Sequence, residues 1–387
     1  EALIGGGLAN SALAEVVAPA WRWIFYVNVP IGLVGLVLAW AAGAGWDTLR
    51  RPGRLDLVGA ALFGVGLAAG LLALTLLGAT TVAGTDLKPA AASAALGGLA
   101  ALATLLAIVR GVRAADPFLD IRLFRSRAFS AAALVSLLTG YTFATAIIGG
   151  AVFVDRVLYG GPDEQRLALG TLAASTAIGA LVSGFAVRVA SYRVVTLVGL
   201  ASSVGGLAAM AAWTPATGIR DVAIALGVFG LGFGLSVTPR STAAVEAAGK
   251  DAFGAASSVV TVARMLGMAI GLAVLTAYGS TTIDRLSTEV NATPDAYLAY
   301  IPENLRDRPL RDPLVVEALE SWASREAASI MVGLFVVAAV VTVAAAVPAL
   351  ALGGSTRRRA AGGDPATLRD DPRMLAGDGN PDPGVIL

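Results

Sequence analysis

Nine apolar runs, each about as long as a membrane-spanning helix, constrain this chain more than any other feature. A helix rises about 1.5 Å per residue, so roughly 20 apolar residues cross a hydrocarbon core of about 30 Å. Only 14% of the residues are charged, against about 25% in soluble proteins. We therefore predict an all-α polytopic membrane protein with nine full spans and, over residues 2–14, the end of a partial one. The runs cover approximately 23–44, 56–78, 93–112, 128–154, 167–188, 194–213, 220–243, 254–280 and 327–352.

Missing residue types exclude several kinds of chemistry. The sequence has no cysteine and no histidine, which excludes disulfides, thiolate or imidazole metal sites and the Ser-His-Asp triad. A net charge of +1 argues against a nucleic-acid partner. The sequence has no phosphate-binding loop, so we do not expect transport driven by ATP. We expect no cofactor, no metal ion and no enzymatic activity. A membrane-embedded transferase remains an alternative, and its only dense cluster of candidate groups is Asp116, Asp120, Arg122 and Arg125.

The distribution of arginine and lysine predicts the orientation. Fifteen lie after the first, third, fifth and seventh runs and at the start of the tail, with Arg240 assigned to the connection after the seventh run. The other short connections hold five. Positive charge concentrates on cytoplasmic loops, so we predict a multi-pass protein of the inner (plasma) membrane with a cytoplasmic C-terminus. Thr238-Pro239-Arg240 is expected to kink or end its helix near the inner surface.

Arg264 interrupts the run at 254–280 about ten residues from its start. An arginine near the middle of a membrane costs about 2.5–3.5 kcal/mol, and such residues mark ion or substrate pathways. We predict that Arg264 lines a transport pathway and faces an acidic partner or a wet cavity. The alternative is an arginine that reaches the interface or pairs with a backbone carbonyl. A passive channel, a further alternative for the whole protein, predicts no central arginine.

Polar side chains recur on one face of the run at 128–154. Threonines at about helical spacing suit a polar stripe beside an aqueous cavity, whereas hydrogen bonds back to the same helix are the alternative. Met268, on the run that carries Arg264, offers an adaptable apolar contact, with filling of the core as its alternative. The predicted pathway residues, besides Arg264, are Thr139, Tyr141, Thr142, Thr145 and Met268.

Three stretches, WRWIFYVNVPIG at 21–32, PFLDIRLFRSRAF at 117–129 and GAASSVVTVARMLGMAIG at 254–271, resemble one family in order and spacing. They resemble the fourteen-helix drug/proton antiporter branch of the major facilitator superfamily. The first stretch supplies the signature residues Trp21, Arg22, Asn28 and Pro30. Gly184, Arg188 and Arg193 resemble the second-half copy of the family's cytoplasmic gating motif, although positive-inside topology alone also explains the two arginines.

The resemblance implies the C-terminal part of a major facilitator fold whose N-terminal bundle lies upstream of this sequence. Residues 1–44 would end that bundle, 45–127 would carry two linker helices with inner loops, and 128–352 would form the C-terminal six-helix bundle. This bundle would include an outer connection at 281–326, and 353–387 would be a disordered cytoplasmic tail. The implied partners are the missing bundle, the lipid bilayer, a proton and a small amphipathic molecule or lipid.

The resemblance implies proton-coupled efflux of drugs or other amphipathic compounds by alternating access, with Arg264 as the counterpart of a carboxylate. No acid lies deep inside any run, so that carboxylate is expected from the upstream part, or in a lesser role from Asp155. The alternative function is export of membrane lipids or glycolipids toward the envelope, because the long outer connection resembles that of mycobacterial lipid exporters in the same branch. Ordered helical extensions within 281–326 would favour the lipid exporter.

Overall fold

The computed structural model describes residues 23–43, 56–77, 89–114, 117–118, 121–249, 252–290, 296–309 and 311–353. Within these ranges all regular secondary structure is helical. The long helices are α3 (Trp23–Gly43), α4 (Leu57–Leu77), α5 (Pro89–Arg113), α6 (Arg127–Arg156), α7 (Pro162–Val189), α8 (Tyr192–Met210), α9 (Ile219–Ala248), α10 (Phe253–Val290) and α11 (Pro313–Ala349); the short 3₁₀ helices are η2 (Ile121–Arg125), η4 (Ala296–Tyr300) and η5 (Glu303–Leu305).

Eight of the described helices, α4 to α11, are long and apolar enough to cross a membrane. This confirms the prediction of an all-α, multi-span membrane protein. The first predicted run is also helical, as α3, but its described apolar stretch, Asn28–Ala41, is shorter than the others. The predicted partial span at 2–14 and most of the predicted tail lie outside the described residues.

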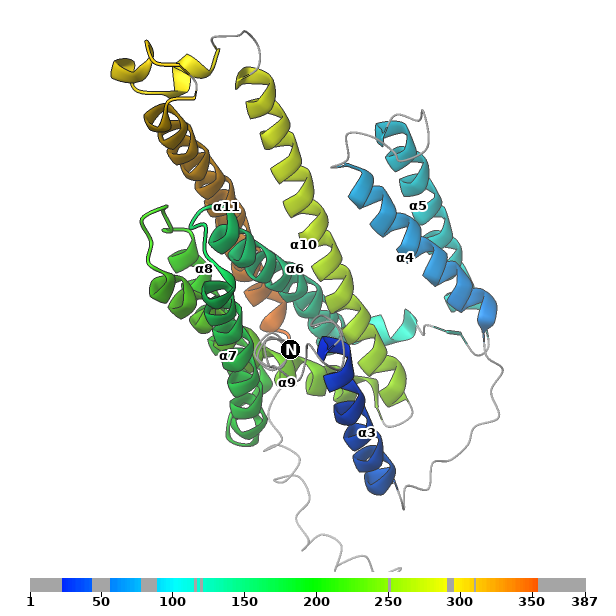
Figure 1. Ribbon diagram of the computed structural model, residues 1–387. Helices are drawn as coiled ribbons and strands as arrows, with labels where there is room; N and C mark the ends of the chain where they lie inside the picture. The colour runs from blue at the N-terminus through cyan, green and yellow to red at the C-terminus, as the bar shows by residue number, and fades with distance from the viewer. Residues whose placement is uncertain are drawn as a thin grey trace, which may run out of the picture.

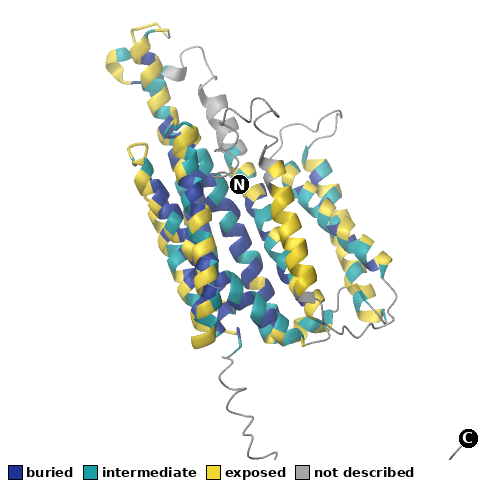
Figure 2. Ribbon diagram, turned by 60° about the horizontal axis from the view of Figure 1, so that its bottom comes forward, coloured by how far each residue is buried: buried dark blue, intermediate teal, exposed yellow. Residues whose placement is uncertain are grey.

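Helices α6 to α11 pack as one bundle. Helix α6 contacts α9, α10 and α11, while α9 lies against both α7 and α8. Helices α4 and α5 form a separate hairpin beside α10 (Figure 1). Buried residues concentrate in the bundle, whereas every described side chain of α3 is exposed (Figure 2). The bundle therefore holds most of the tertiary packing in the described chain.

Two clusters of buried side chains stabilise the two ends of the bundle. At the end predicted to be outer, Trp213 packs on Phe153 and Phe335, with ring centroids 4.7 and 5.2 Å apart. At the end predicted to be inner, Phe129 and Tyr192 are buried with Leu352. Burial of such large apolar side chains contributes about 1.5–3 kcal/mol each in water, while between helices in lipid their close packing is the main gain.

Helix α9 corrects one expectation. It does not end at Pro239 but continues to Ala248, so Arg240 lies inside a helix rather than in an inner connection. A proline removes one backbone hydrogen bond, and membrane helices tolerate this where neighbouring groups satisfy the freed carbonyl. Without Arg240 the count from the sequence is fourteen basic residues on one side and in the tail against five on the other, so the charge bias remains.

The long connection at 281–326 contains extensions of the helices on both of its sides. Helix α10 continues through residues 281–290, and α11 starts at Pro313. Each helix is therefore about 55 Å long, well beyond a hydrocarbon core of about 30 Å, and both reach past α6–α8 (Figure 1). The side chain of Asp312 caps α11 by accepting the Leu314 N–H at 3.0 Å, and Tyr300 of η4 packs on Trp322 with ring centroids 4.5 Å apart. The region between the spans is thus largely helical.

Candidate functional site

Helices α6 and α10 approach each other at glycines. A Cβ on Gly140 would fall on the carbonyl oxygen of Arg264, and one on Gly267 would fall on the carbonyl oxygen of Leu137. One turn further along α10, a Cβ on Gly271 would lie 2.7 Å from the Tyr141 carbonyl oxygen. Small residues permit such backbone contact between membrane helices. The backbone at Arg264 is therefore fixed against α6.

Arg264 lies eleven residues after the start of α10, about 16 Å along the helix axis. Its side chain is partly buried, and it forms no ion pair with a described carboxylate. This position matches the prediction of a cation well inside the membrane. Whether it lines a transport pathway remains a prediction.

A second intramembrane cation, Arg240 of α9, was not expected. Its side chain is only 1% exposed, and its Nη1 donates a hydrogen bond to the hydroxyl of Thr139 on α6. The guanidinium also lies 5.3 Å from the centre of the Phe233 ring, which suits a cation–π interaction. Its Nη2 has no hydrogen-bond partner among the described residues. Arg240 is thus buried but only partly satisfied.

The two arginines meet the same turn of α6. Arg240 bonds to Thr139, and Gly140, the next residue, packs against the backbone of Arg264. Two like charges in a medium of low dielectric constant repel strongly, and a buried charge without a partner costs several kcal/mol. In the described part of the chain no acid offsets them. The arrangement therefore favours an anionic group near Arg264, the more accessible of the two.

The predicted threonine stripe is buried, and its hydroxyls bond to their own helix. Thr139 donates to the Val135 carbonyl at 2.6 Å, Thr142 to Thr139 at 3.1 Å and Thr145 to Tyr141 at 3.1 Å. This matches the alternative of hydrogen bonds within the helix. Only Thr139 also receives a hydrogen bond from another helix. Ser136, one turn earlier, is fully buried, and its hydroxyl has no partner among the described residues.

The other residues that the sequence singled out lie in separate parts of the structure. Tyr141 is buried beside α10, and Met268 is partly buried on α10. The signature residues Asn28 and Pro30 lie on α3, with exposed side chains. Trp21 and Arg22 lie outside the described residues. Asp155 is half-exposed at the end of α6, where it pairs with Arg156 at 3.0 Å, so it is remote from the membrane interior.

At the end of the bundle predicted to be inner, the predicted gating residues do not meet one another in the described part of the chain. Gly184 has open space beside it, Arg188 lies over Phe185 of its own helix at 5.4 Å, and the side chain of Arg193 is exposed. A hydrogen bond at this end joins two residues that the sequence did not indicate as partners. The Tyr192 hydroxyl donates to Glu246 at 2.8 Å and thereby joins α8 to the continuation of α9.

The chain is similar in sequence to curated mycobacterial transporters. A triacylglyceride transporter of Mycolicibacterium hassiacum is 30% identical over 318 residues, which is 76% of this chain and 58% of that protein. The triacylglyceride transporter of Mycolicibacterium smegmatis is 28% identical and covers 72% of this chain and 52% of its own length. A multidrug resistance protein B homolog of Mycobacterium tuberculosis is 28% identical over 70% of this chain and 49% of its own length.

The chain thus spans between about half and three fifths of the length of these relatives. No protein-family model matches it. Among solved structures, a bacterial homolog of the human lysosomal transporter Spinster, in an inward-facing and occupied conformation, has a TM-score of 0.45 at 16% identity. That likeness covers 76% of this chain and 66% of the other.

Proposed function

We propose that this chain forms the greater part of an exporter of membrane lipids, of the major facilitator type. The observation that carries the proposal is its similarity, over about three quarters of its length, to proteins named triacylglyceride transporters. In this proposal the working transporter, like the longer proteins to which the chain is similar, includes more than the spans described above. Drug efflux, the function first implied by the sequence motifs, becomes the second candidate.

The helical extensions of α10 and α11 support the lipid over the drug. Both helices are about 25 Å longer than a hydrocarbon core of about 30 Å, and their extensions lie on the side opposite the arginine-rich loops. A small amphipathic drug is released into water at the membrane surface and needs no such structure. A lipid with long acyl chains has to stay shielded from water until it reaches another apolar phase.

In this proposal Arg264 is the fixed cation of the coupling site. A carboxylate that faces it would stay ionised, because a nearby cation lowers the pKa of an acid, and separation of the two would raise that pKa again. Rocking of two helix bundles about a central site would alternate these states. The acid itself would come from a part of the protein beyond the described residues. Arg240, behind Arg264, would strengthen the preference for an anion.

Drug efflux keeps one specific observation in its favour, the similarity to the multidrug resistance protein B homolog. The two functions can be separated in proteoliposomes that contain the intact protein, expressed from its complete reading frame. Under a pH gradient, lipid export predicts delivery of a fluorescent triacylglyceride to acceptor vesicles at a rate above that of protein-free vesicles. Drug efflux predicts movement of ethidium instead.

A variant with residues 281–326 replaced by a short flexible linker sharpens the test. We expect it to lose lipid delivery while any ethidium transport stays, because only the lipid needs the extensions. Equal loss of both would point to misfolding, which thermal unfolding of the purified variant detects. Ethidium transport without lipid delivery in the unmodified protein would overturn the proposal.

A further inference from the structure

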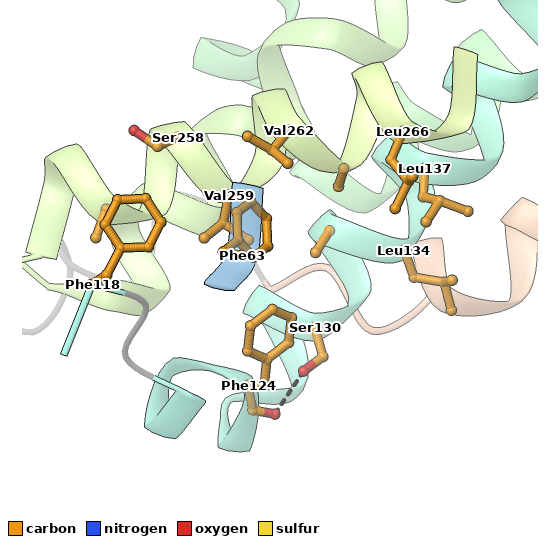
Figure 3. A pocket seen from close by; sticks show the side chains of 13 residues that line it. Phe63, Phe118, Phe124, Ser130, Leu134, Leu137, Ser258, Val259, Val262 and Leu266 are labelled. Atoms are coloured by element: carbon orange, nitrogen blue, oxygen red, sulfur yellow. Dashed lines mark hydrogen bonds between the residues drawn. The ribbon is translucent and has the colours of Figure 1, made fainter. Parts of the chain in front are cut away.

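A cavity of about 510 Å³ lies where the α4–α5 hairpin meets the bundle. Its walls come from α4, the segment around η2, α6 and α10, and they are almost entirely apolar. Figure 3 shows the main lining side chains, among them Phe63, Phe118, Phe124, Leu134, Leu137 and Leu266. The rings of Phe63 and Phe118, which belong to different segments, have centroids 6.0 Å apart. The volume lies in the usual range of ligand pockets, about 300–1,000 Å³.

The cavity is about as deep as one leaflet of a bilayer. Along α10 it extends from Ala255, two residues after the helix start, to Leu266, a rise of about 16 Å. Half of a hydrocarbon core is about 15 Å. Since α6 and α10 both begin at the arginine-rich face, the cavity occupies the leaflet on that side, which positive-inside topology makes the cytoplasmic one.

The cavity walls require no polar ligand. The Ser130 hydroxyl donates to the Phe124 carbonyl oxygen at 2.6 Å (Figure 3), and the Ser258 hydroxyl donates to the Gly254 carbonyl oxygen at 2.9 Å. Both hydroxyls that line the cavity are therefore satisfied within the protein. An occupant gains nothing here from its own hydrogen bonds, so an acyl chain suits these walls better than a polar molecule does.

Arginines neighbour the cavity lining along the chain: Arg125 directly follows Phe124, and Arg127 lies three residues before Ser130. The end of α5, η2 and the start of α6 lie within residues 110–127, a segment with five arginines and two aspartates. Arg113, Arg125 and Arg127 have exposed side chains. Asp56 neutralises one further arginine, since its carboxylate accepts a bond from Arg110 Nε at 2.6 Å. The excess of arginine attracts a negatively charged lipid head group.

We infer that this cavity binds an anionic phospholipid of the cytoplasmic leaflet. One acyl chain fills the space between α4, α6 and α10, and the phosphate lies at the arginines of residues 110–127. Across this cavity, the acyl chain fills the gap that side chains leave between the hairpin and the bundle. This site does not depend on what the protein transports, so its test and that of lipid export can fail separately.

The sequence has no cysteine, so an introduced thiol is the only one within these 387 residues, and labelling of the intact protein without the substitution gives the background from any thiol elsewhere. Ser258→Cys places a thiol in the cavity wall with little change in volume. Ser257→Cys, on the same helix and also exposed, does not line the cavity and serves as the matched control. Maleimide labelling of the intact protein is followed in detergent micelles that contain phosphatidylglycerol or phosphatidylcholine.

We expect phosphatidylglycerol to slow labelling of Ser258→Cys about tenfold at a concentration about ten times its Kd, since only the unoccupied fraction reacts. Phosphatidylcholine should protect much less, and Ser257→Cys should react equally in both lipids. Arg125→Gln should weaken the protection by phosphatidylglycerol alone. Val262→Trp, which fills the cavity, should remove about one bound phosphatidylglycerol in native mass spectrometry, whereas Val182→Trp on the exposed face of α7 should not.

Two outcomes would overturn the inference. Equal protection by both lipids would show that the head group is not recognised. No protection by either, with the bound lipid retained in Val262→Trp, would show that the cavity is not a lipid site. The conservative Ser258→Cys variant keeps the test valid even where Val262→Trp folds poorly.

Discussion

The bundle of α6–α11 and the hairpin of α4–α5 contain the same kinds of residues but use them differently. Both are rich in glycine and alanine. In the bundle, Gly140 and Gly267 touch the backbone of the neighbouring helix, so a side chain at either position would collide with it. In the hairpin, a Cβ added to Gly66 of α4 would lie 2.8 Å from the Thr104 hydroxyl oxygen of α5, whereas one added to Gly64, Gly97 or Gly98 would meet no neighbouring atom within 4 Å. Glycine content alone therefore does not reveal where membrane helices meet.

Polar contacts between helices are more numerous in the bundle. Among the described residues Arg240 bonds to Thr139, Tyr192 to Glu246 and Ser324 to the Val157 carbonyl oxygen. Among the described residues of the hairpin, the Ser93 hydroxyl donates a buried hydrogen bond to the Ala73 carbonyl oxygen at 2.9 Å. Asp56, just before α4, accepts a hydrogen bond from the N–H of Phe118, which precedes η2. A cavity of about 680 Å³ runs along the hairpin. The comparison teaches that the bundle supplies the fixed framework and the hairpin is an attached element.

The largest effect should come from filling a glycine contact in the bundle. Gly267→Leu would force α10 away from α6, because its side chain would meet the Leu137 carbonyl group. Overpacking costs about 1–3 kcal/mol and occasionally more, and here a rigid backbone has to move, so we expect about 3 kcal/mol or greater loss of stability. Thermal unfolding of the purified protein measures it.

Gly98→Leu in the hairpin is the matched control for this change. Since that position is exposed and has open space beside it, we expect a shift in unfolding free energy within about 0.5 kcal/mol, as for other unconstrained surface sites. Similar destabilisation by both variants would contradict the division between framework and attached element.

The second effect concerns transport. Arg264→Ala in the intact protein should lower pH-gradient-driven transport by about a hundredfold, because breaking a pair between buried charges costs about 3–5 kcal/mol. The fold should persist, since the side chain is only partly buried. Arg220→Ala, which removes an exposed arginine from the first turn of α9, is the control and should transport at the normal rate. Full gradient-driven transport by Arg264→Ala would remove the coupling role.

Arg240 allows a finer test, because stability and transport should separate. Replacement of buried charges by apolar groups of similar size is often neutral or stabilising by about 1–4 kcal/mol. We therefore expect Arg240→Met to unfold at the same or a higher temperature, and to transport about tenfold more slowly through the loss of about 1.4 kcal/mol of electrostatic support. A parallel fall in both would mean that Arg240 only holds α6 and α9 together.

The two arginines also show how far the sequence could predict this molecule. Arg264 interrupts a long apolar run, so its position stood out. Arg240 directly follows Pro239, a usual helix end, and its partner Thr139 is 101 residues away; nothing local indicates that contact. The spans were predictable because the bilayer demands apolar length. Where α9 and α10 end was not predictable, because beyond the hydrocarbon core helices carry polar residues that resemble a loop.

The smallest effect should appear at Asp56, which joins the hairpin to the η2 segment. Its carboxylate accepts hydrogen bonds from the Gly59 N–H at 2.8 Å, from Arg110 Nε at 2.6 Å and from the Phe118 N–H at 3.3 Å. The Gly59 N–H above all, and then the Arg110 side chain, hold the pKa of Asp56 below its ordinary value of 3.8. A lowered pKa means that the carboxylate stabilises the fold above about pH 4 and stops doing so as the pH falls through the lowered pKa.

Asp56→Asn should therefore loosen the hairpin at neutral pH without unfolding the bundle. We expect backbone hydrogen exchange at the inner end of α5 to speed up severalfold at pH 5–8, the difference from the unmodified protein being constant over that range because Asp56 stays ionised throughout. Asp221→Asn, at an exposed site in the first turn of α9, is the control and should leave α5 unchanged. Faster exchange throughout α6 and α9 as well would contradict the view that the hairpin loosens by itself, since the loss of one hairpin contact would then have reached the framework.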